Sequence, residues 1–215
     1  FIPLFEQNGF IVDLDLHVFE KVCAMLRKWL DNGLTPVPVS VNMSRGHLAD
    51  PQFLERYETI RRAYDVPPEL LEIELTESLV FENPHLLVQF IERIRAHGYH
   101  CSIDDFGSGY SSLRMLLQYP SSIIKLDRSL VREMAQSTAK MHFIQSIVFA
   151  CHQFGKTVCM EGVESAEQNE MIRNTGCDMI QGYYHYRPME LSQMYHLVSQ
   201  TGSGKQGKEA SACRS

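Results

Sequence analysis

The sequence YHCSIDDFGSG, residues 99–109, decides the fold class. It begins as an apolar run with the composition of a buried β-strand, reaches two consecutive acids, and ends in a turn rich in glycine and serine. A polar side chain at the C-terminal end of a predicted strand is not an isolated feature here. The same order of signals is repeated along the chain on both sides of this stretch.

Strand-like and helical patterns alternate through almost the whole chain. The expected strands are 37–42, 70–75, 99–104, 122–126, 157–160 and 177–180. The expected helices are 14–30, 51–63, 83–98, 141–154, and one that opens at the capping box of Ser165 and Gln168. Strands that alternate with helices of this length predict a parallel sheet covered by helices.

A residue able to bind a metal ion or a phosphate stands at or near the end of each predicted strand. These residues are Asn42, Glu74, Asp104 with Asp105, Lys125, Glu161 and Gln181. A (β/α)8 barrel gathers such residues at its C-terminal mouth, whereas an open, doubly wound sheet spreads them along an edge. No GxGxxG or GxxxxGK[ST] loop opens a helix, which weakens the case for a nucleotide-binding open sheet. We therefore expect an α/β fold of the (β/α)8, TIM-like barrel type.

Composition and charge restrict the class of protein. The chain has 215 residues, of which 44% are hydrophobic and 21% charged, as in a globular domain with a sizeable core. A net charge of −6 gives no broad basic field, so a nucleic-acid polymer is not an expected partner. No apolar run has the length of a membrane segment. The six cysteines form no CxxC pair, so we expect reduced, mostly buried thiols of a cytosolic protein.

The oxygen-rich set of strand-end residues indicates a site for a hard divalent cation. Carboxylates and an amide without a Cys/His set suit Mg²⁺ or Mn²⁺. The adjacent pair Asp104 and Asp105 could bind two ions, the arrangement used for in-line attack on a phosphodiester. Lys125 would then supply positive charge for a phosphate or for a metal-bound hydroxide.

Simpler interpretations stay open at this point. A single acid at a strand end is more often a helix cap or a solvated loop residue than a ligand. Residues 105–109 fit a tight turn about as well as a loop that closes on a ligand, and Glu77 and Glu164 could be surface acids. From chemistry alone, a barrel lyase or aldolase with Lys125 as a Schiff base is another candidate, although the surrounding acids would keep its amine protonated.

Seven motifs together resemble the EAL domain of bacterial cyclic di-GMP phosphodiesterases. They are FIPL with Glu6 (1–6), VNMS (41–44), ELTES (74–78), DDFGSGYSSL (104–113), KLD (125–127), EGVE (161–164), and QGY with the later Arg187-Pro188 (181–188). Their order and spacing match the family from Phe1 to about Leu197. The resemblance implies an EAL-type barrel with one antiparallel strand. It also implies hydrolysis of cyclic di-GMP to linear pGpG with two Mg²⁺ or Mn²⁺ ions, or, as the alternative, a non-catalytic cyclic di-GMP receptor.

The resemblance implies roles for individual residues. The implied metal ligands are Asn42, Glu74, Asp104, which bridges the two ions, and Asp105. The implied catalytic residues are Lys125, which positions or deprotonates the attacking water, and Glu161 and Gln181, which hold the water shell of the second metal and the substrate side. Glu77 resembles the acid that anchors the loop 106–112 and couples metal binding to dimerisation. The implied substrate-side residues are Ser108, Gly109, Tyr183, Arg187 and Pro188.

The predicted organisation is one EAL-type phosphodiesterase domain over residues 1–198 and a polar, disordered tail or linker over residues 199–215. The implied partners are cyclic di-GMP and a second copy of the domain in a homodimer. Upstream sensory or GGDEF-type domains would fit a longer parent, whose catalytic domain is expected in the cytoplasm even where the parent is anchored in a membrane.

One departure from the family pattern concerns the N-terminus. The Glu-Ala-Leu strand, which supplies another metal ligand and a phosphate-binding arginine, would precede Phe1, as would the strand before it. We therefore expect about six of the eight barrel strands in this chain and two exposed strand edges. The chain alone is expected to be poorly soluble, to exchange elements with a second copy, or to bind metal weakly. Its full-length parent is expected to be catalytic.

Overall fold

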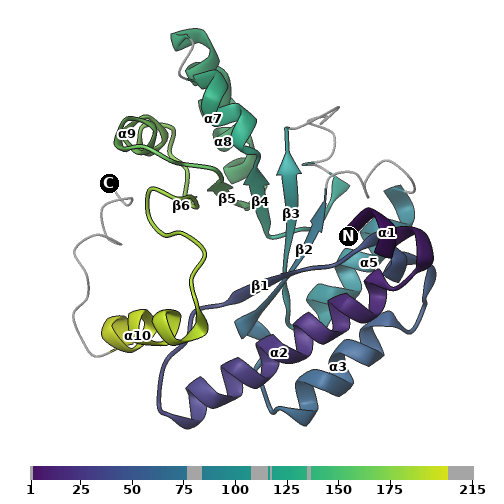
Figure 1. The fold of residues 1–215 in the computed structure, drawn as a ribbon. Helices are drawn as coiled ribbons and strands as arrows, with labels where there is room; N and C mark the ends of the chain where they lie inside the picture. Colours follow the sequence, from purple (N-terminus) through teal and green to yellow (C-terminus); the bar gives the residue numbers. More distant parts are fainter. Residues whose placement is uncertain (1, 77–83, 108–115, 117, 135–136, 203–215) are drawn as a thin grey trace. The chain divides into compact units, whose positions relative to one another are not determined.

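The computed structural model describes residues 2–76, 84–107, 116, 118–134 and 137–202 (Figure 1). The chain divides into two compact units. Unit 1 comprises Phe1–Cys101 and Leu191–Lys205, and unit 2 comprises Ser102–Glu190 and Gln206–Ser215. No helix in the described part of the chain is long and apolar enough to cross a membrane.

Six strands form a sheet whose order, β1-β2-β3-β4-β5-β6, is the order of the chain. They are β1 (Val39–Asn42), β2 (Leu71–Thr76), β3 (His100–Phe106), β4 (Ile123–Leu126), β5 (Thr157–Met160) and β6 (Met179–Ile180). The pairs β1–β2, β3–β4, β4–β5 and β5–β6 are all parallel. Each of the six predicted strands is present, and the α/β class with a parallel sheet is confirmed.

Helices separate β1 from β2, β2 from β3, β4 from β5 and β5 from β6, as the alternation of patterns predicts; the connection from β3 to β4 lies mostly outside the described residues. They are α1 (Ile2–Asn8), α2 (Ile11–Asp31), α3 (Phe53–Ala63), α5 (Pro84–Ala96), α7 (Arg128–Met134), α8 (Thr138–Gln153), α9 (Ala166–Arg173) and α10 (Leu191–Gly202). Two 3-10 helices, η1 (Arg45–Ala49) and η2 (Pro68–Leu70), shorten the connections. The capping box predicted at Ser165 and Gln168 is present at the start of α9.

The C-terminal helix α10 extends into the stretch predicted as a tail. It ends at Gly202, so residues 199–202 are helical rather than irregular. Residues 203–215 lie outside the described residues, and the tail or linker stays a prediction for them.

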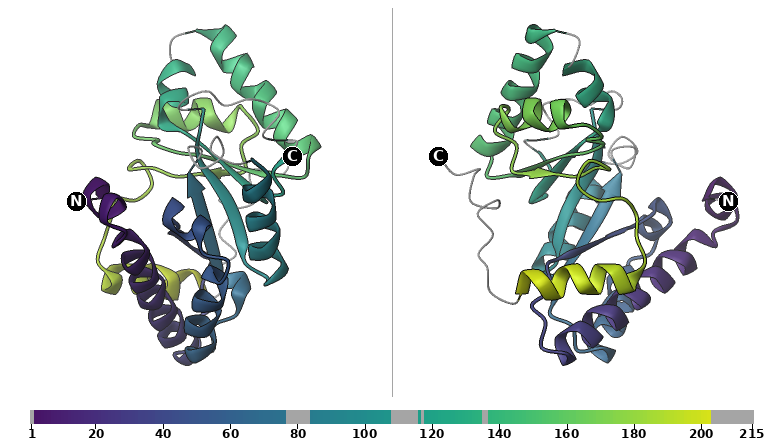
Figure 2. Two further views of the ribbon diagram at one scale, coloured as in Figure 1. Left: turned by 90° about the vertical axis from the view of Figure 1, so that its right-hand side faces the viewer. Right: turned by 60° about the vertical axis from the view of Figure 1, so that its left-hand side comes forward.

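Unit 1 has an aromatic core between helices. Helices α2 and α3 lie side by side in both views of Figure 2, and Phe19 of α2 meets Tyr57 of α3 edge to face, with ring centroids 4.6 Å apart. Phe53 of α3 stacks on Phe90 of α5 at 3.9 Å. All four rings are buried, so the faces of α2, α3 and α5 that carry them form the core of this unit.

A buried carboxylate, Glu58 of α3, connects Arg61 of the same helix with Tyr99, the residue before β3. Its oxygens accept hydrogen bonds from Arg61 at 2.8 and 2.9 Å and from the hydroxyl of Tyr99 at 2.6 Å. The hydrogen bonds from Arg61 lower the pKa of Glu58 to about 2, against the opposing effect of burial. Burial and the negative charge of Glu58 raise the pKa of Tyr99. The network therefore needs an ionised Glu58 and a neutral Tyr99.

Replacing this carboxylate should weaken the fold in a pH-dependent way. We expect Glu58→Gln to lower the free energy of unfolding at pH 7 by about 3 kcal/mol, because it leaves the Arg61 guanidinium without its counter-ion. Since the pKa of Glu58 is lowered, its stabilisation is complete above about pH 5 and is lost as the pH falls toward 2. Urea unfolding from pH 7 to pH 3, with the exposed Glu55→Gln on the same helix as control, measures this. A constant difference between wild type and Glu58→Gln over that range would contradict it.

The cysteines of the described residues are buried and take part in no disulfide. Cys23, Cys101, Cys151, Cys159 and Cys177 form no disulfide, as predicted. Burial raises the pKa of Cys23 and of Cys177 to about 12. These thiols therefore act as small core side chains rather than as nucleophiles. The sixth cysteine, Cys213, lies outside the described residues.

Candidate active site

A β-bulge in β3 places two neighbouring acids opposite one lysine. The register pairs Ile103 with Ile124 and Phe106 with Leu126, so Asp104 and Asp105 occupy the space that Lys125 alone fills on β4. In a regular strand, adjacent side chains point to opposite faces of the sheet. The bulge breaks this alternation. It is accommodated at Asp105, whose backbone has a left-handed φ of 58°.

Lys125 is the centre of an ion-pair cluster in unit 2. Its side chain is buried, and its Nζ lies 2.7 Å from Oε1 of Glu161 and 3.3 Å from Oδ1 of Asp104. Glu161 is the first residue after β5. Its backbone N–H donates a hydrogen bond to Leu126 O at 3.0 Å, which fixes the position of Glu161 along β4. An ammonium held by two carboxylates is unsuited to Schiff-base chemistry, which requires a neutral amine.

The carboxylates of Asp104, Asp105 and Glu161 converge. One oxygen of each lies within 4.8 Å of the other two, close enough for a shared cation. Oδ1 of Asp104 is buried and makes no well-aligned hydrogen bond among the described residues, apart from its ion pair with Lys125. An oxygen-only donor set with an unsatisfied buried carboxylate oxygen fits a hard divalent cation such as Mg²⁺ or Mn²⁺.

Two glycines allow close backbone contacts after β5: Gly182 lets the segment after β6 approach it, and Gly162 packs against the start of α7. A Cβ on Gly182 would lie 2.1 Å from the backbone oxygen of Val163, and a Cβ on Gly162 would lie 2.2 Å from Cβ of Arg128. Backbone hydrogen bonds from Val163 N to Gln181 O and from Tyr184 N to Val163 O close the same contact. Gln181 therefore lies next to the Glu161 segment because no side chain separates the two backbones.

This close approach makes a sharp prediction for glycine replacement. Gly182→Ala should destabilise the protein by about 3 kcal/mol or more, because the atoms it meets are backbone atoms that cannot rotate away. Gly155→Ala is the matched control: its φ is +66°, but a Cβ there has nothing within 4 Å, so only conformational strain of about 1 kcal/mol is expected. Thermal and urea unfolding compare the two variants, and equal losses would refute the role of the contact.

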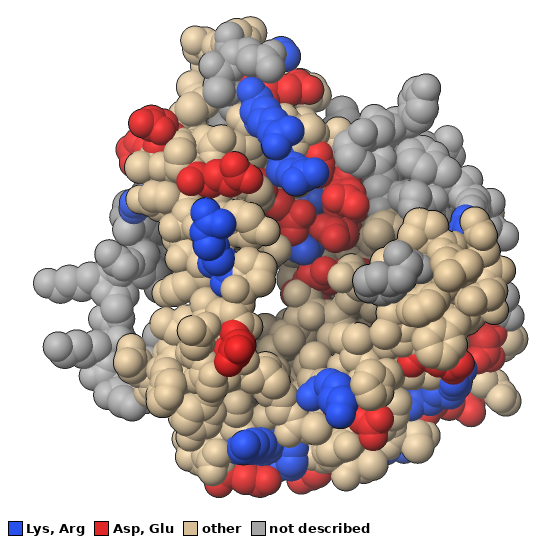
Figure 3. All heavy atoms as spheres, viewed as in Figure 1, with Lys and Arg blue, Asp and Glu red and all other residues tan. Residues whose placement is uncertain are grey.

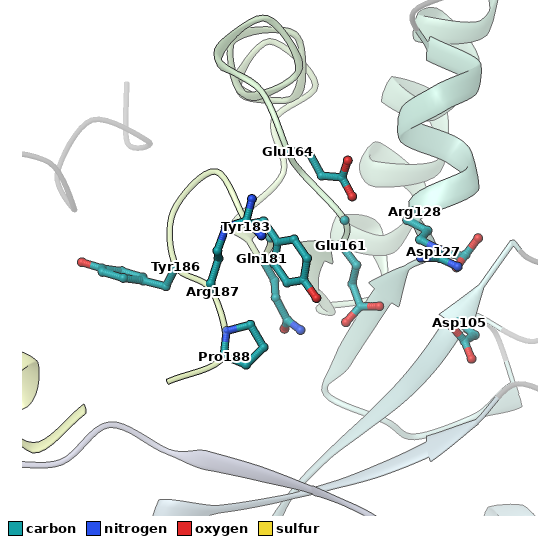
Figure 4. Close-up of a pocket in the computed structure, with 12 residues that line it drawn as sticks. Asp105, Asp127, Arg128, Glu161, Glu164, Gln181, Tyr183, Tyr186, Arg187 and Pro188 are labelled. Atoms are coloured by element: carbon teal, nitrogen blue, oxygen red, sulfur yellow. The ribbon is translucent and has the colours of Figure 1, made fainter. Parts of the chain in front are cut away.

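The convergent acids open onto a cavity of about 570 Å³ in unit 2. Its lining residues are Asp105, Asp127, Arg128, Glu161, Gly162, Glu164, Gln181, Gly182, Tyr183, Tyr186, Arg187 and Pro188. Figure 4 shows Glu161 between Asp105, Asp127 and Arg128 on one side and Gln181, Tyr183 and Arg187 on the other. The Arg187 guanidinium stacks over the Tyr183 ring, 4.9 Å from its centroid. Acidic and basic side chains also gather on the part of unit 2 that faces the viewer in Figure 3.

Unit 1 places two further predicted ligands side by side. Asn42, the last residue of β1, is in register with Glu74 of β2, so both side chains lie on the same face of the pair. Glu74 is buried, whereas Asn42 lines a smaller cavity of about 290 Å³ together with Asp15, Ser44 and Thr76.

The structure places most of the predicted site residues. Unit 2 brings together Asp104, Asp105, Lys125 and Glu161, and its cavity adds Gln181, Tyr183, Arg187 and Pro188. Glu77, Ser108 and Gly109 lie outside the described residues, so the loop anchor and the loop over the site stay predictions.

Six lining residues were not among the predicted site residues. They are Asp127, Arg128, Gly162, Glu164, Gly182 and Tyr186. Glu164 was weighed as a surface acid, and it is exposed, but it lines the cavity. The available signal was position: Asp127 and Arg128 directly follow β4, and Glu164 lies three residues after Glu161.

The comparisons with known proteins identify the family. Residues 1–188 match the family model of the EAL domain, so this chain belongs to the EAL domain family. MucR of Pseudomonas aeruginosa strain PAO1, named a bifunctional diguanylate cyclase/cyclic di-GMP phosphodiesterase, is 32% identical over 199 residues, which cover 93% of this chain and 29% of MucR. The chain spans about a quarter to a third of the length of the curated relatives that it matches.

Solved structures confirm the EAL-type fold. The PaMucR phosphodiesterase in complex with c-di-GMP has a TM-score of 0.83 and 32% identity, with 90% of this chain and 78% of that chain covered. The Klebsiella pneumoniae BlrP1 manganese/cy-diGMP complex has a TM-score of 0.71 and 29% identity, with 80% of this chain and 43% of that chain covered.

Proposed function

We propose that the full-length parent of this chain hydrolyses cyclic di-GMP to linear pGpG in bacterial second-messenger signalling, using two Mg²⁺ or Mn²⁺ ions. The observation that carries the proposal is the convergence of Asp104, Asp105 and Glu161 around Lys125 at the edge of an open cavity. Membership of the EAL family, which includes relatives named cyclic di-GMP phosphodiesterases, supports the choice of substrate.

The residues that would hold the ions are the predicted ligands Asn42, Glu74, Asp104 and Asp105. For Asp104 and Asp105, the support is the bulge that turns both carboxylates to one site. For Asn42 and Glu74, it is their matched register on β1 and β2 and the resemblance of their motifs. Bound divalent ions would polarise a phosphate oxygen. They would also lower the pKa of a metal-bound water, so that a hydroxide nucleophile is available at neutral pH.

The side chains around the ions have separate tasks in this proposal. Lys125, held between two carboxylates, positions the attacking water by its charge. Glu161 keeps the lysine in place and, with Gln181, orients water on the substrate side. Tyr183 offers a flat face for a guanine base, while Arg187 and Pro188 border the same part of the cavity.

The proposal is tested by product analysis. Incubation with cyclic di-GMP and Mg²⁺ or Mn²⁺ should yield pGpG, EDTA should abolish it, and Asp104→Asn should lower the rate by about a hundredfold or more, because a shared ligand is lost. Glu170→Gln, an exposed acid on α9, is the control and should retain the wild-type rate. Tight binding of cyclic di-GMP without formation of pGpG would contradict the proposed activity and indicate a cyclic di-GMP receptor.

We propose, further, that the chain is part of a longer, cytoplasmic signalling protein. The fraction of each relative that it spans leaves room for sensory or GGDEF-type domains, and the free, buried thiols suit a reducing compartment.

A homodimer is the proposed assembly. Two phenylalanines of α8, Phe143 and Phe149, are 61% and 65% exposed, which is unusual for such large apolar side chains. If α8 contributes to the dimer contact, Phe143→Asp combined with Phe149→Asp should yield monomers, whereas Glu133→Gln on α7 should not. Light scattering during gel filtration measures this. A monomeric wild type contradicts the homodimer, and a dimer that survives the double change contradicts the contribution of α8.

A further inference from the structure

Arg128 is a cation of the cavity that the family motifs do not single out. It is the first residue of α7, three positions after Lys125, and it borders the cavity next to Asp127. In Figure 4, Arg128 lies on the opposite side of Glu161 from Tyr183 and Arg187. The two arginines of the cavity therefore face it from opposite sides.

The guanidinium of Arg128 is uncommitted. Among the described residues it takes part in no ion pair and no hydrogen bond, whereas Lys125 is held by Asp104 and Glu161. Arg187 already stacks on Tyr183. An exposed arginine without a protein partner normally points into solvent, and no function is inferred for it. Arg128 differs because it lines the cavity of the convergent acids.

The backbone around Arg128 is fixed more firmly than an exposed helix start requires. Asp127 N donates to Phe106 O at 3.1 Å, and Ser129 N donates to Oδ1 of Asp127 at 2.9 Å. On the other side, Gly162 packs so closely against Arg128 that any Cβ there would collide with it. The base of the Arg128 side chain is thus held at one place beside Glu161, although no partner of its guanidinium is found in the described part of the chain.

A charge argument points to a phosphate as the ligand of this head. The cavity is lined by four acids, Asp105, Asp127, Glu161 and Glu164, and by two cations, Arg128 and Arg187. Cyclic di-GMP carries two anionic phosphates, and divalent ions at the convergent acids would bind one of them. Among the described residues that line the cavity, Arg128 and Arg187 are the cations that could bind the other. An arginine presents planar, paired donors that match two phosphate oxygens.

We propose that Arg128 binds the phosphate of cyclic di-GMP that is not attacked, and thereby sets substrate affinity. This inference rests on the proposed function, because it takes cyclic di-GMP as the substrate. Arg128 is here a specificity residue that contacts the substrate, with no part in metal binding or in proton transfer.

The test separates substrate binding from metal binding in a protein that contains the whole chain. Titration calorimetry measures the affinity for a non-hydrolysable phosphorothioate analogue of cyclic di-GMP with Mn²⁺ present, and the affinity for Mn²⁺ alone. Arg128→Gln should weaken analogue binding by about tenfold to a hundredfold, as expected for a lost charged hydrogen bond. It should leave Mn²⁺ binding as strong or slightly stronger, since one cation near the acids is removed.

Two further variants complete the design. Arg128→Lys should recover only part of the analogue affinity, because an ammonium cannot donate in the paired geometry. Arg132→Gln, one turn further along α7, exposed and not part of the cavity lining, should bind both ligands as wild type does.

Each other outcome is equally decisive. Unchanged analogue binding in Arg128→Gln, with a wild type that binds the analogue, overturns this inference and leaves the proposed function intact. Parallel weakening of analogue and Mn²⁺ binding shows that Arg128 only supports the local structure, which also overturns it. A wild type that binds no analogue overturns the proposed function and this inference together.

Discussion

The contact of the Lys125 ammonium with Asp104 and Glu161 is the interaction on which the site depends. It joins β4 to the bulge in β3 and to the segment after β5, so three strand ends share one buried charge. Three carboxylates within 4.8 Å of one another would repel strongly without a positive charge among them. The positive charge of the lysine offsets this repulsion and holds Asp104 and Glu161 close to it, so the carboxylates converge as a divalent cation requires.

The backbone of β3 contributes as much as the charges do. Asp105 has a left-handed conformation that most side chains adopt only at a cost of about 1 kcal/mol or more. Asp is among the residues that tolerate it best, because its short polar side chain can bond locally. The conformation delivers two consecutive carboxylates to one site, which the regular alternation of a strand forbids. Strained backbone at this point is consistent with a functional role for the acids.

The amino-acid sequence was sufficient to predict the class of fold and most of the acids of the site. Other features could not be predicted from it, for physical reasons. Each strand was predicted because a short apolar run must be buried, and β5 was predicted with both ends correct. Helix α1 was missed because it buries no side chain and so has no apolar stripe. The bulge at Asp104 and Asp105 was invisible because a register shift belongs to the pairing of two strands, not to either sequence. Arg128 was missed because a residue that starts a short helix shows no pattern of its own.

The contact of Gly182 with Val163 has a consequence for how this site can change over time. The spacing between Glu161 and Gln181 is set by main-chain atoms, through backbone hydrogen bonds and the absence of a side chain at Gly182. Neighbouring residues such as Tyr184 contribute only backbone atoms to this spacing. Sequence drift at those neighbours can therefore alter the rim that meets a ligand while the chemistry beneath it keeps its geometry, which gives one scaffold a route to new ligand preferences.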